Sequence, residues 1–405
     1  MMRVGLLAAS GQLGGAERVV LETVRGLSTL GIESTVLALE SGPLLEAALR
    51  EGAQVAEALR LPAGLAGLGD AGQSRVAVAV GLMCAAAPLP AYVRRLARTL
   101  RRHEADVIHS HGIKTHVLAA LLPRRRPVIW HLHDYVSLRP VSMALLRRLA
   151  RRCDLVIAVS ESIAQDVRRW LPRDVPVVVL HNAVDTERFS PRGAVANLDA
   201  LAGLPPAPPD TLRVGLPATF ARWKGHEVFL RSLAELKRRD VRGYLIGGAV
   251  YQTGDSQWSE RELRDLVATL GLQEQIGLTG FLDDMPAAYR ALDVVVHAST
   301  RPEPFGLVIP EAMACGRLVL ATRTGGAAEL FEPDVHAVGL DIAQVPTMTA
   351  ALRALLADPD RRAAIASRAR AHVVARFGRE RFAAALGETL SLLARERAAV
   401  PARTW

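Results

Sequence analysis

Short apolar runs alternate along the chain with segments whose apolar residues recur at helical spacing. The runs before residue 190 are 3–9, 34–39, 106–109, 128–132, 155–159 and 175–180. Several are almost continuous Val, Ile and Leu, which is typical of parallel strands buried on both faces. Between the first two runs, Val20, Val24 and Leu27 follow a helical period that stops at Gly31. This alternation predicts an open, doubly wound α/β sheet.

The alternation is interrupted at 190–210, where Pro, Gly and Ala cluster, and then starts again. A composition rich in Pro is typical of a linker. We therefore predict an N-terminal Rossmann-like domain over 1–190, a linker over 191–211, a C-terminal Rossmann-like domain over 212–375 and a helical tail over 376–395. Because open α/β sheets bind ligands at the carboxyl ends of their strands, two such sheets facing across a cleft would offer a site for two substrates.

Composition narrows the classes of partner. Of the 405 residues, 50 are Lys or Arg and 41 are Asp or Glu, so the net charge is +9, with many arginines in the N-terminal half. A basic face suits polyanions, anionic lipid or phosphorylated substrates; solvated helix faces explain the charge equally well. Binding to nucleic acid is disfavoured, because aromatic residues make up 4% of the chain and do not alternate with the basic ones.

Three isolated cysteines, Cys84, Cys153 and Cys315, favour a reducing compartment over a disulfide framework. The uncharged stretch 76–93 contains Gly and Pro and is not expected to span a membrane. We therefore expect a cytoplasmic protein. The segment 92–102 has apolar residues on one helical face and arginines on the other. Either it lies on the inner, anionic surface of a membrane, or its apolar face packs on its own sheet.

The sharpest candidate chemistry lies in the second half. Glu303 follows a predicted strand and Glu311 lies in the next predicted helix, whose first residues, Phe305 to Leu307, have amides that could bind a phosphate. Two carboxylates beside a phosphate site suit a ligand that also carries hydroxyl groups, such as a nucleotide sugar. The alternative is that Glu303 caps the helix and Glu311 is solvated.

Other candidates are weaker by themselves. Lys224, with Arg222 nearby, could reach a diphosphate from the loop after the first strand of the second domain, or be an ordinary loop lysine. Gly14 and Gly15 precede the first helix, where a phosphate or a plain turn would fit.

Two His-x-His pairs, 109/111 and 131/133, end two strands. They could converge on a metal, contact a sugar or simply pack, and we predict no metal. The Asp-Pro-Asp at 358–360 is interpreted as a loop.

Together these residues resemble a retaining glycosyltransferase of family four over nearly the whole chain. The motifs that carry the resemblance are Gly-Gly-Ala-Glu at 14–17, His-Asp at 133–134, Ser160, Asn-Ala-Val-Asp at 182–185, Phe-Ser-Pro at 189–191, Trp-Lys-Gly at 223–225, Gly-Phe at 280–281, Pro-Glu-Pro-Phe-Gly at 302–306, Glu-Ala-Met-Ala-Cys-Gly at 311–316 and Gly-Gly at 325–326 with Glu329. The block 302–316 is highly specific. The resemblance implies the B-type fold, with the helix 376–395 crossing back to the first domain.

The resemblance also implies roles for individual residues. The groups that would hold the donor diphosphate are Gly14, Gly15, Lys224 and the amides of Phe305, Gly306 and Leu307. Glu303 and His133 would contact the transferred sugar, Glu311 the ribose, and the backbone near Phe281 the base. The family usually has an arginine five residues before the lysine, where this chain has Thr219, and Arg222 could supply that charge instead. The loop 332–339 also lacks the family's usual Asn-Gly-x-x-Gly.

The implied function is transfer of a sugar from a nucleoside diphosphate to an acceptor hydroxyl with retention of configuration and without a metal or other cofactor. The acceptor would be a cell-envelope polysaccharide or a glycolipid. The alternatives are a sugar-nucleotide epimerase or hydrolase on the same fold, and a non-catalytic protein that binds nucleotide sugars. A nicotinamide dehydrogenase is disfavoured because its glycine fingerprint is missing.

Overall fold

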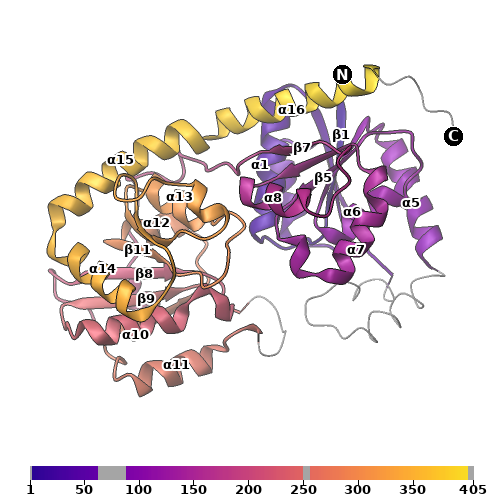
Figure 1. Cartoon of the computed structure of the whole chain (residues 1–405). Coiled ribbons are helices and arrows are strands. Elements are labelled where there is room, and N and C mark those ends of the chain that lie inside the picture. Colours follow the sequence, from indigo (N-terminus) through magenta and orange to yellow (C-terminus); the bar gives the residue numbers. More distant parts are fainter. Residues whose placement is uncertain (1, 63–87, 250–255, 400–405) are drawn as a thin grey trace. The chain divides into compact units, whose positions relative to one another are not determined.

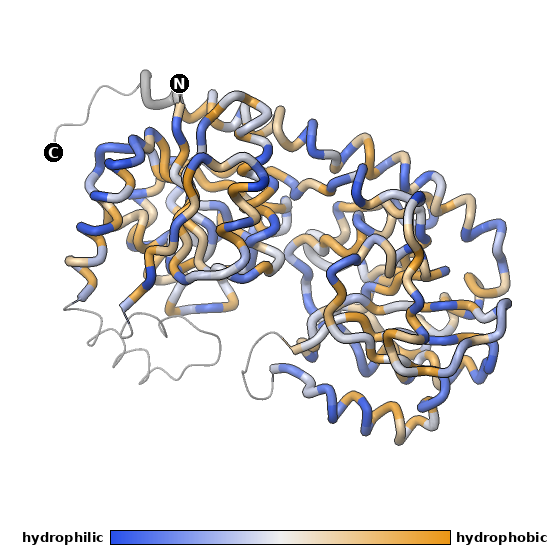
Figure 2. Tube along the Cα trace, turned by 180° about the vertical axis from the view of Figure 1, so that it is seen from behind, coloured by the Kyte–Doolittle hydropathy of each residue, from blue (hydrophilic) through white to orange (hydrophobic). Residues whose placement is uncertain are grey.

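The computed structural model describes residues 2–62, 88–249 and 256–399 (Figure 1). Cys84 and most of the uncharged stretch 76–93 lie outside these residues. The chain divides into a first unit, Met1–Ala183 with Arg379–Trp405, and a second unit, Val184–Gly378. In each unit the hydrophobic residues concentrate on the inner strands, whereas hydrophilic and hydrophobic stretches alternate along the helices (Figure 2).

The first unit contains a parallel sheet with the strand order β3-β2-β1-β4-β5-β6-β7. The strands are β1 (Arg3–Ala8), β2 (Glu33–Ala38), β3 (Val55–Ala58), β4 (Val107–His111), β5 (Val128–Leu132), β6 (Leu155–Ala158) and β7 (Val177–Val179). The helices are α1 (Gly15–Thr29), α2 (Pro43–Arg50), α5 (Pro88–Arg102), α6 (Ile113–Leu121), α7 (Pro140–Leu149), α8 (Glu161–Arg168) and α16 (Arg379–Ala399). The doubly wound sheet predicted from the apolar runs is confirmed; β3, whose residues are half-buried, was not predicted.

Helix α16 packs against α1 in this unit. Val24 and Leu27 of α1 share one buried cluster with Phe382 and Leu386 of α16. The guanidinium group of Arg379 also donates two hydrogen bonds, of 2.7 and 2.6 Å, to the carboxylate of Glu22. The last helix therefore belongs structurally to the unit that begins the chain.

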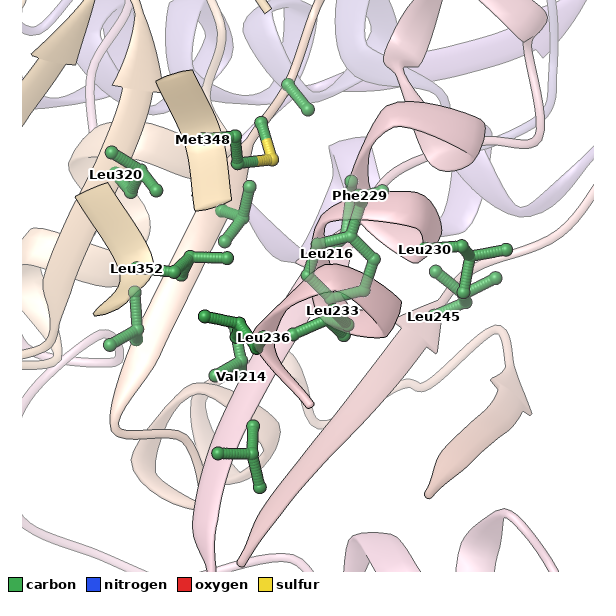
Figure 3. Packing of buried hydrophobic residues seen from close by; sticks show 14 of the residues in the cluster. Val214, Leu216, Phe229, Leu230, Leu233, Leu236, Leu245, Leu320, Met348 and Leu352 are labelled. Carbon is green, nitrogen blue, oxygen red and sulfur yellow. The ribbon is translucent and has the colours of Figure 1, made fainter. Parts of the chain in front are cut away.

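The second unit has the parallel strand order β10-β9-β8-β11-β12-β13. The strands are β8 (Leu212–Pro217), β9 (Val241–Ile246), β10 (Ile276–Gly280), β11 (Val294–His297), β12 (Leu318–Thr322) and β13 (Val338–Leu340). The helices are α9 (Leu198–Leu201), α10 (His226–Leu236), α11 (Glu260–Thr269), α12 (Met285–Arg290), α13 (Val308–Ala314), α14 (Val345–Ala357) and α15 (Pro359–Phe377). Figure 3 shows part of its core, where Phe229 and Leu233 of α10 lie near Leu216 of β8, with Met348 and Leu352 of α14 beside them.

The segment 191–211, predicted to be a linker, is instead part of the second unit. Within it, Asp199 is 5% exposed and accepts hydrogen bonds from Tyr244 (2.7 Å), Arg242 (2.5 Å) and Arg213 (3.3 Å). Burial alone would raise the pKa of Asp199, but the hydrogen bonds from Tyr244 and Arg242 lower it to about 2. The proline-rich composition was a misleading signal, because the buried Asp199 fastens this segment to β8 and β9 and Arg290 donates a 2.6 Å hydrogen bond to the carbonyl of Ala194.

The structure decides between the two alternatives for 92–102 and corrects the interpretation of 358–360. In α5 the apolar face is turned inward, with Tyr92, Leu96 and Leu100 at 4% exposure or less, so this helix has no apolar face to lay on a bilayer. The segment 358–360 is not a loop: Asp358, the one residue between α14 and α15, caps α15 by accepting a 2.8 Å hydrogen bond from the backbone N–H of Arg361, and Pro359 and Asp360 are already in that helix. Among the described residues, no helix combines the length and apolar character needed to cross a membrane.

Candidate active site

The strand order of the second unit determines where its loops meet. Strand β8 lies between β9 and β11, so the order of strands reverses between β8 and β11. The loops that leave β8 and β11 at their carboxyl ends diverge there, and this is where open α/β sheets bind ligands. The first loop carries Lys224 and the second carries Glu303. A hydrogen bond of 2.7 Å from the amide of Thr300 to the carbonyl of Trp223 ties the two loops together.

Lys224 and Glu303 form a buried ion pair at this point. The Nζ of Lys224 lies 2.9 Å from Oε1 and 2.7 Å from Oε2 of Glu303, and the two side chains are 19% and 7% exposed. Oε2 of Glu303 also accepts a 2.7 Å hydrogen bond from the hydroxyl of Ser299 and lies 3.1 Å from Nε2 of His297. Lys224 is therefore not an ordinary solvated lysine. Glu303 does not cap α13 either, since the residue at the N-cap of that helix is Leu307.

Glu303 remains ionised despite its burial. Burial by itself would raise its pKa, but the positive charge of Lys224 and the hydrogen bond from His297 outweigh that effect and hold the pKa well below its usual range. The carboxylate is thus an acceptor of hydrogen bonds at neutral pH.

Backbone contacts hold this carboxylate in place. The amide of Glu303 donates to the carbonyl of Thr324 (3.1 Å), and its carbonyl accepts from the amide of Gly326 (2.7 Å). The Gly-Gly motif after β12 is thereby joined to the loop after β11, as neighbouring strands allow. Sequence spacing placed Lys224 and Glu303 on separate loops, and the sheet order brings them into contact.

Two glycines are needed where these loops pass close to other groups. Gly225 has φ +79°, and a Cβ there would lie 2.0 Å from the carbonyl oxygen of Ala298. Gly306 has φ +91°, and a Cβ would lie 3.2 Å from Cγ of Glu303. Both positions favour glycine because a left-handed backbone is strained with any side chain. The motif glycines therefore let the Lys224 and Glu303 loops approach each other.

Arg222 contacts one acidic and one aromatic side chain. Its Nη2 lies 2.6 Å from Oε1 of Glu262 in α11, and its guanidinium group stacks 3.9 Å from the ring centroid of Trp258. To replace the arginine that the family has at the position of Thr219, Arg222 would share its charge between Glu262 and the donor. Whether it does so stays a prediction.

The remaining donor-site candidates lie around the same edge of the sheet. Glu311 is in the first turn of α13 and accepts a 2.8 Å hydrogen bond from the hydroxyl of Tyr289 in α12. Phe281 directly follows β10 and is 64% exposed, whereas Phe305 is buried. Ser299, His297 and Tyr289 were not among the predicted site residues, although Ser299 and His297 alternate at the end of β11 and so share one face.

In the first unit, the candidates follow β1 and β5. Gly14 is the N-cap of α1. A Cβ on Gly15 would meet nothing within 4 Å, whereas one on Gly14 would lie 2.7 Å from Oε2 of Glu17, so the backbone is open at Gly15 only. Glu17, in the first turn of α1, is half-buried, and this desolvation, together with the charges of Glu40 and Asp134, raises its pKa. His133 directly follows β5. Burial lowers its pKa to about 4, so its ring is neutral at pH 7.

The two His-x-His pairs lie side by side because β4 and β5 are neighbours, with His111 opposite His131. His109, His111 and His131 are buried, and Nδ1 of His111 lies 3.0 Å from Nε2 of His133. Within the described part of the chain, both ring nitrogens of His109 and of His131, and Nε2 of His111, have no hydrogen-bond partner. A buried polar group without a partner costs about 1–3 kcal/mol. This cluster therefore calls for an explanation.

Comparison with known proteins identifies the family. The model of Glycosyltransferase Family 4 matches residues 13–188, and that of Glycosyl transferases group 1 matches residues 206–372. The lipopolysaccharide core biosynthesis mannosyltransferase LpsB of Rhizobium meliloti is 34% identical over 250 residues, 61% of this chain and 68% of LpsB. The chain belongs to glycosyltransferase family 4.

Two further relatives extend the comparison. A GDP-mannose-dependent α-(1-6)-phosphatidylinositol monomannoside mannosyltransferase of Mycolicibacterium smegmatis is 29% identical over 69% of this chain and 74% of its own length. The crystal structure of Anabaena HepE with UDP-glucose is 26% identical with a TM-score of 0.78, covering 96% of this chain and all of HepE. This family 4 chain therefore has the B-type fold of two Rossmann-like domains and is a sugar-transferring enzyme.

Proposed function

We propose that this family 4 enzyme transfers a sugar from a nucleoside-diphosphate donor to a hydroxyl group of a cell-envelope glycan or glycolipid, with retention of anomeric configuration. The observation that carries the proposal is the buried pair of Lys224 and Glu303 at the carboxyl ends of β8 and β11. It supplies a cation for a phosphate and an ionised carboxylate for sugar hydroxyls. The solved complex of HepE with UDP-glucose supports a nucleotide-sugar donor.

In the resting enzyme, Lys224 and Glu303 satisfy each other. When the donor binds, the ammonium group of Lys224 exchanges its carboxylate partner for the diphosphate, and Glu303 accepts hydrogen bonds from hydroxyl groups of the transferred sugar. The hydrogen bonds from Ser299 and His297 hold Glu303 in position during this exchange. Because its pKa is depressed, Glu303 stays an acceptor and does not serve as a general acid at neutral pH.

The rest of the donor lies along the same sheet edge in this proposal. Glu311, fixed by Tyr289, accepts hydrogen bonds from the ribose. The backbone beside Phe281 reads the base, and the amides of the segment Phe305–Leu307 approach the diphosphate. Within the first unit, the amides at Gly14 and at the open Gly15 suit a phosphate group, and the neutral ring of His133 suits a sugar hydroxyl.

Negative charge develops on the diphosphate as the glycosidic bond breaks, while the sugar becomes oxocarbenium-like. Lys224 and the backbone amides stabilise that charge, and Arg222 adds to it by sharing its contact with Glu262. We propose that these groups do this without a divalent cation at the diphosphate. Attack on the same face of the sugar, with the leaving phosphate accepting the acceptor's proton, gives retention.

We place a membrane-facing surface at α7 instead of α5. Val141 and Leu145 of α7 are 50% and 38% exposed, and their spacing of four residues puts them on one helical face. Leu138, in the 3-10 turn just before α7, is 70% exposed. Exposed arginines follow in the last turn, at 147 and 148. Apolar side chains bordered by arginines suit an anionic bilayer. The relatives named for lipopolysaccharide core and phosphatidylinositol mannoside synthesis support an acceptor at such a surface.

A thermal-shift panel of UDP-, GDP- and ADP-sugars tests the donor site, followed by transfer assays with the sugar that stabilises the protein. Lys224→Met and Glu303→Gln should each lower turnover by on the order of 10²-fold or more, whereas the matched control Lys237→Asn, on the exposed end of α10, should not. Added Mg²⁺ or Mn²⁺ should not change the rate, and NMR of the product should show the donor's anomeric configuration. Near-normal turnover in both variants would contradict the proposal, and conversion of the donor without acceptor would favour an epimerase or hydrolase.

Vesicle sedimentation tests the α7 surface. The protein should sediment with vesicles that contain phosphatidylglycerol and not with phosphatidylcholine alone, and salt should weaken the binding. Leu138→Ser with Val141→Ser should abolish it, while Val195→Ser, an equally exposed apolar residue of the second unit, should not. Binding that is unaffected by the double substitution would refute this surface.

A further inference from the structure

We propose that His109, His111 and His131 bind a divalent transition-metal ion, with Zn²⁺ as the reference ion, inside the first unit. The three residues come from two neighbouring strands, and one nitrogen of each lies within 4.8 Å of the others. The three ligands belong to the first unit, whereas Lys224 and Glu303 belong to the second; His133, the proposed sugar contact, borders the histidine cluster through its hydrogen bond with His111. The proposal does not depend on the function proposed above.

Strand geometry explains why these three rings converge. His109 and His111 are two residues apart on β4 and so project from the same face of the sheet. On β5, His131 pairs with His111 in register and projects beside it. The ring centroids of His109, His111 and His131 are 4.5 to 5.3 Å apart. Two histidines at i and i+2 on one strand, joined by one from the next strand, form a rigid three-nitrogen set of the kind that zinc accepts.

The distances are close to those that an ion requires. Zn–N bonds of about 2.0–2.1 Å in a tetrahedral site put the ligand nitrogens roughly 3.4 Å apart. The ligand nitrogens lie within 4.8 Å of one another, so binding an ion requires them to close in and requires the nearly parallel rings of His109 and His131 (interplanar angle 10°) to turn toward a common point. Imidazole suits Zn²⁺, Cu²⁺ and Ni²⁺, whereas Mg²⁺ and Ca²⁺ prefer oxygen ligands. The donor set therefore selects a transition metal.

The hydrogen bond between His111 and His133 sets a suitable tautomer. If Nδ1 of His111 carries the proton and donates to Nε2 of His133, then Nε2 of His111 presents a lone pair toward the other two rings. A ligating histidine usually donates its second ring N–H in this way, which fixes its orientation. His133 is thus the outer partner of the site.

Burial argues for an occupant of the site. In the described part of the first unit, five ring nitrogens of the three residues are buried without a hydrogen-bond partner. Histidine binds a metal ion through a lone pair of its neutral imidazole ring, so buried nitrogens without a hydrogen-bond partner are available as ligands. An ion bound by three of these nitrogens would replace the missing hydrogen bonds and hold the ends of β4 and β5 together. It would also position His133 through His111.

The test measures zinc binding to the full chain by isothermal titration and by metal analysis after gel filtration. We expect about one equivalent of Zn²⁺ for the chelator-treated protein. At 100 times the dissociation constant, the melting temperature of the first unit should rise by about 5–10 °C. Substitution with Co²⁺ should produce the visible absorption of a tetrahedral nitrogen site.

Variants separate a metal site from a packed histidine cluster. His131→Leu and His109→Leu remove buried unpartnered nitrogens, so each apo-protein should fold with unchanged or higher stability but lose the zinc-dependent rise. His226→Leu, which replaces a buried histidine of the second unit, is the matched control and should keep it. Glu303→Gln should also keep it, so failure of the donor assignment would not affect this result. Zinc binding that is absent in the parent protein, or equal in the parent and His131→Leu, would overturn the proposal.

Discussion

Replacing Lys224 with methionine preserves the length of the side chain but removes the charge that Glu303 faces. Breaking a buried ion pair by removing one partner typically costs about 3–5 kcal/mol, because the other charge stays buried. Glu303 is 7% exposed and keeps its hydrogen bonds from Ser299 and His297. We therefore expect the second unit to lose about 3 kcal/mol, the lower end of that range.

The loss of stability in Lys224→Met should be larger at pH 8 than at pH 5. In the parent protein the depressed pKa of Glu303 contributes stability that is present at neutral pH and is lost only as pH falls through the folded-state pKa. In Lys224→Met the main cause of that depression is gone, and burial raises the pKa. Folding then favours the protonated carboxyl, so the variant should be closer to the parent at pH 5 than at pH 8.

Native-state hydrogen exchange read by mass spectrometry is the appropriate assay, because peptides from β8 and β11 report on the second unit alone. The double variant Lys224→Met with Glu303→Gln should lose less stability than the sum of the two single variants. Each single variant leaves one buried charge without its partner, whereas the double variant leaves none. A cost that is equal at both pH values, or that is additive in the double variant, would refute the idea that these groups are a coupled buried pair.

Three further predictions concern the same unit and its edge. Asp199→Asn should destabilise the second unit by about 2–3 kcal/mol at pH 7, and the difference from the parent should disappear as pH falls from 4 toward 2, measured by urea unfolding. Gly225→Ala places a Cβ 2.0 Å from a backbone carbonyl oxygen at φ +79°, so it should lower the stability by at least about 2 kcal/mol and should lower activity. The control Gly15→Ala should leave the stability, measured by thermal melting, almost unchanged. Tyr289→Phe removes a 2.8 Å hydrogen bond to Glu311, which should cost about 1.5–3 kcal/mol and raise KM for the donor more than it lowers kcat; unchanged KM would argue against a ribose contact.

Much of the fold could be predicted from apolar periodicity, because each buried strand and each amphipathic helix has a local signature. The end of α1 and both ends of β5 were located to within two residues. The segment 191–211 was assigned wrongly, since composition does not reveal that Asp199 is buried against Arg242. For α5, the sequence showed an apolar face but not what covers it, and burial of Tyr92 settled that question.

The residues of the candidate site could be predicted from the sequence, but the contacts between them could not. Lys224 and Glu303 could be singled out because each follows a strand in a loop with glycines. Their contact, and the hydrogen bonds from Ser299 and His297, depend on β8 and β11 being neighbours, which no local pattern states. The histidine cluster is a similar case, because the pairing of β4 with β5 decides that its two pairs form one group.

By itself, the sequence determined which segments become strands and helices and which residues carry charge and chemistry, because periodicity, turn residues and ionisable groups are local properties. Only the tertiary structure decided which of those residues meet, which faces are covered and which charges are buried. Strand order and burial arise from contacts between residues far apart in the chain. The properties that follow from them, such as the ionised, buried state of Glu303, are therefore properties of the folded chain alone.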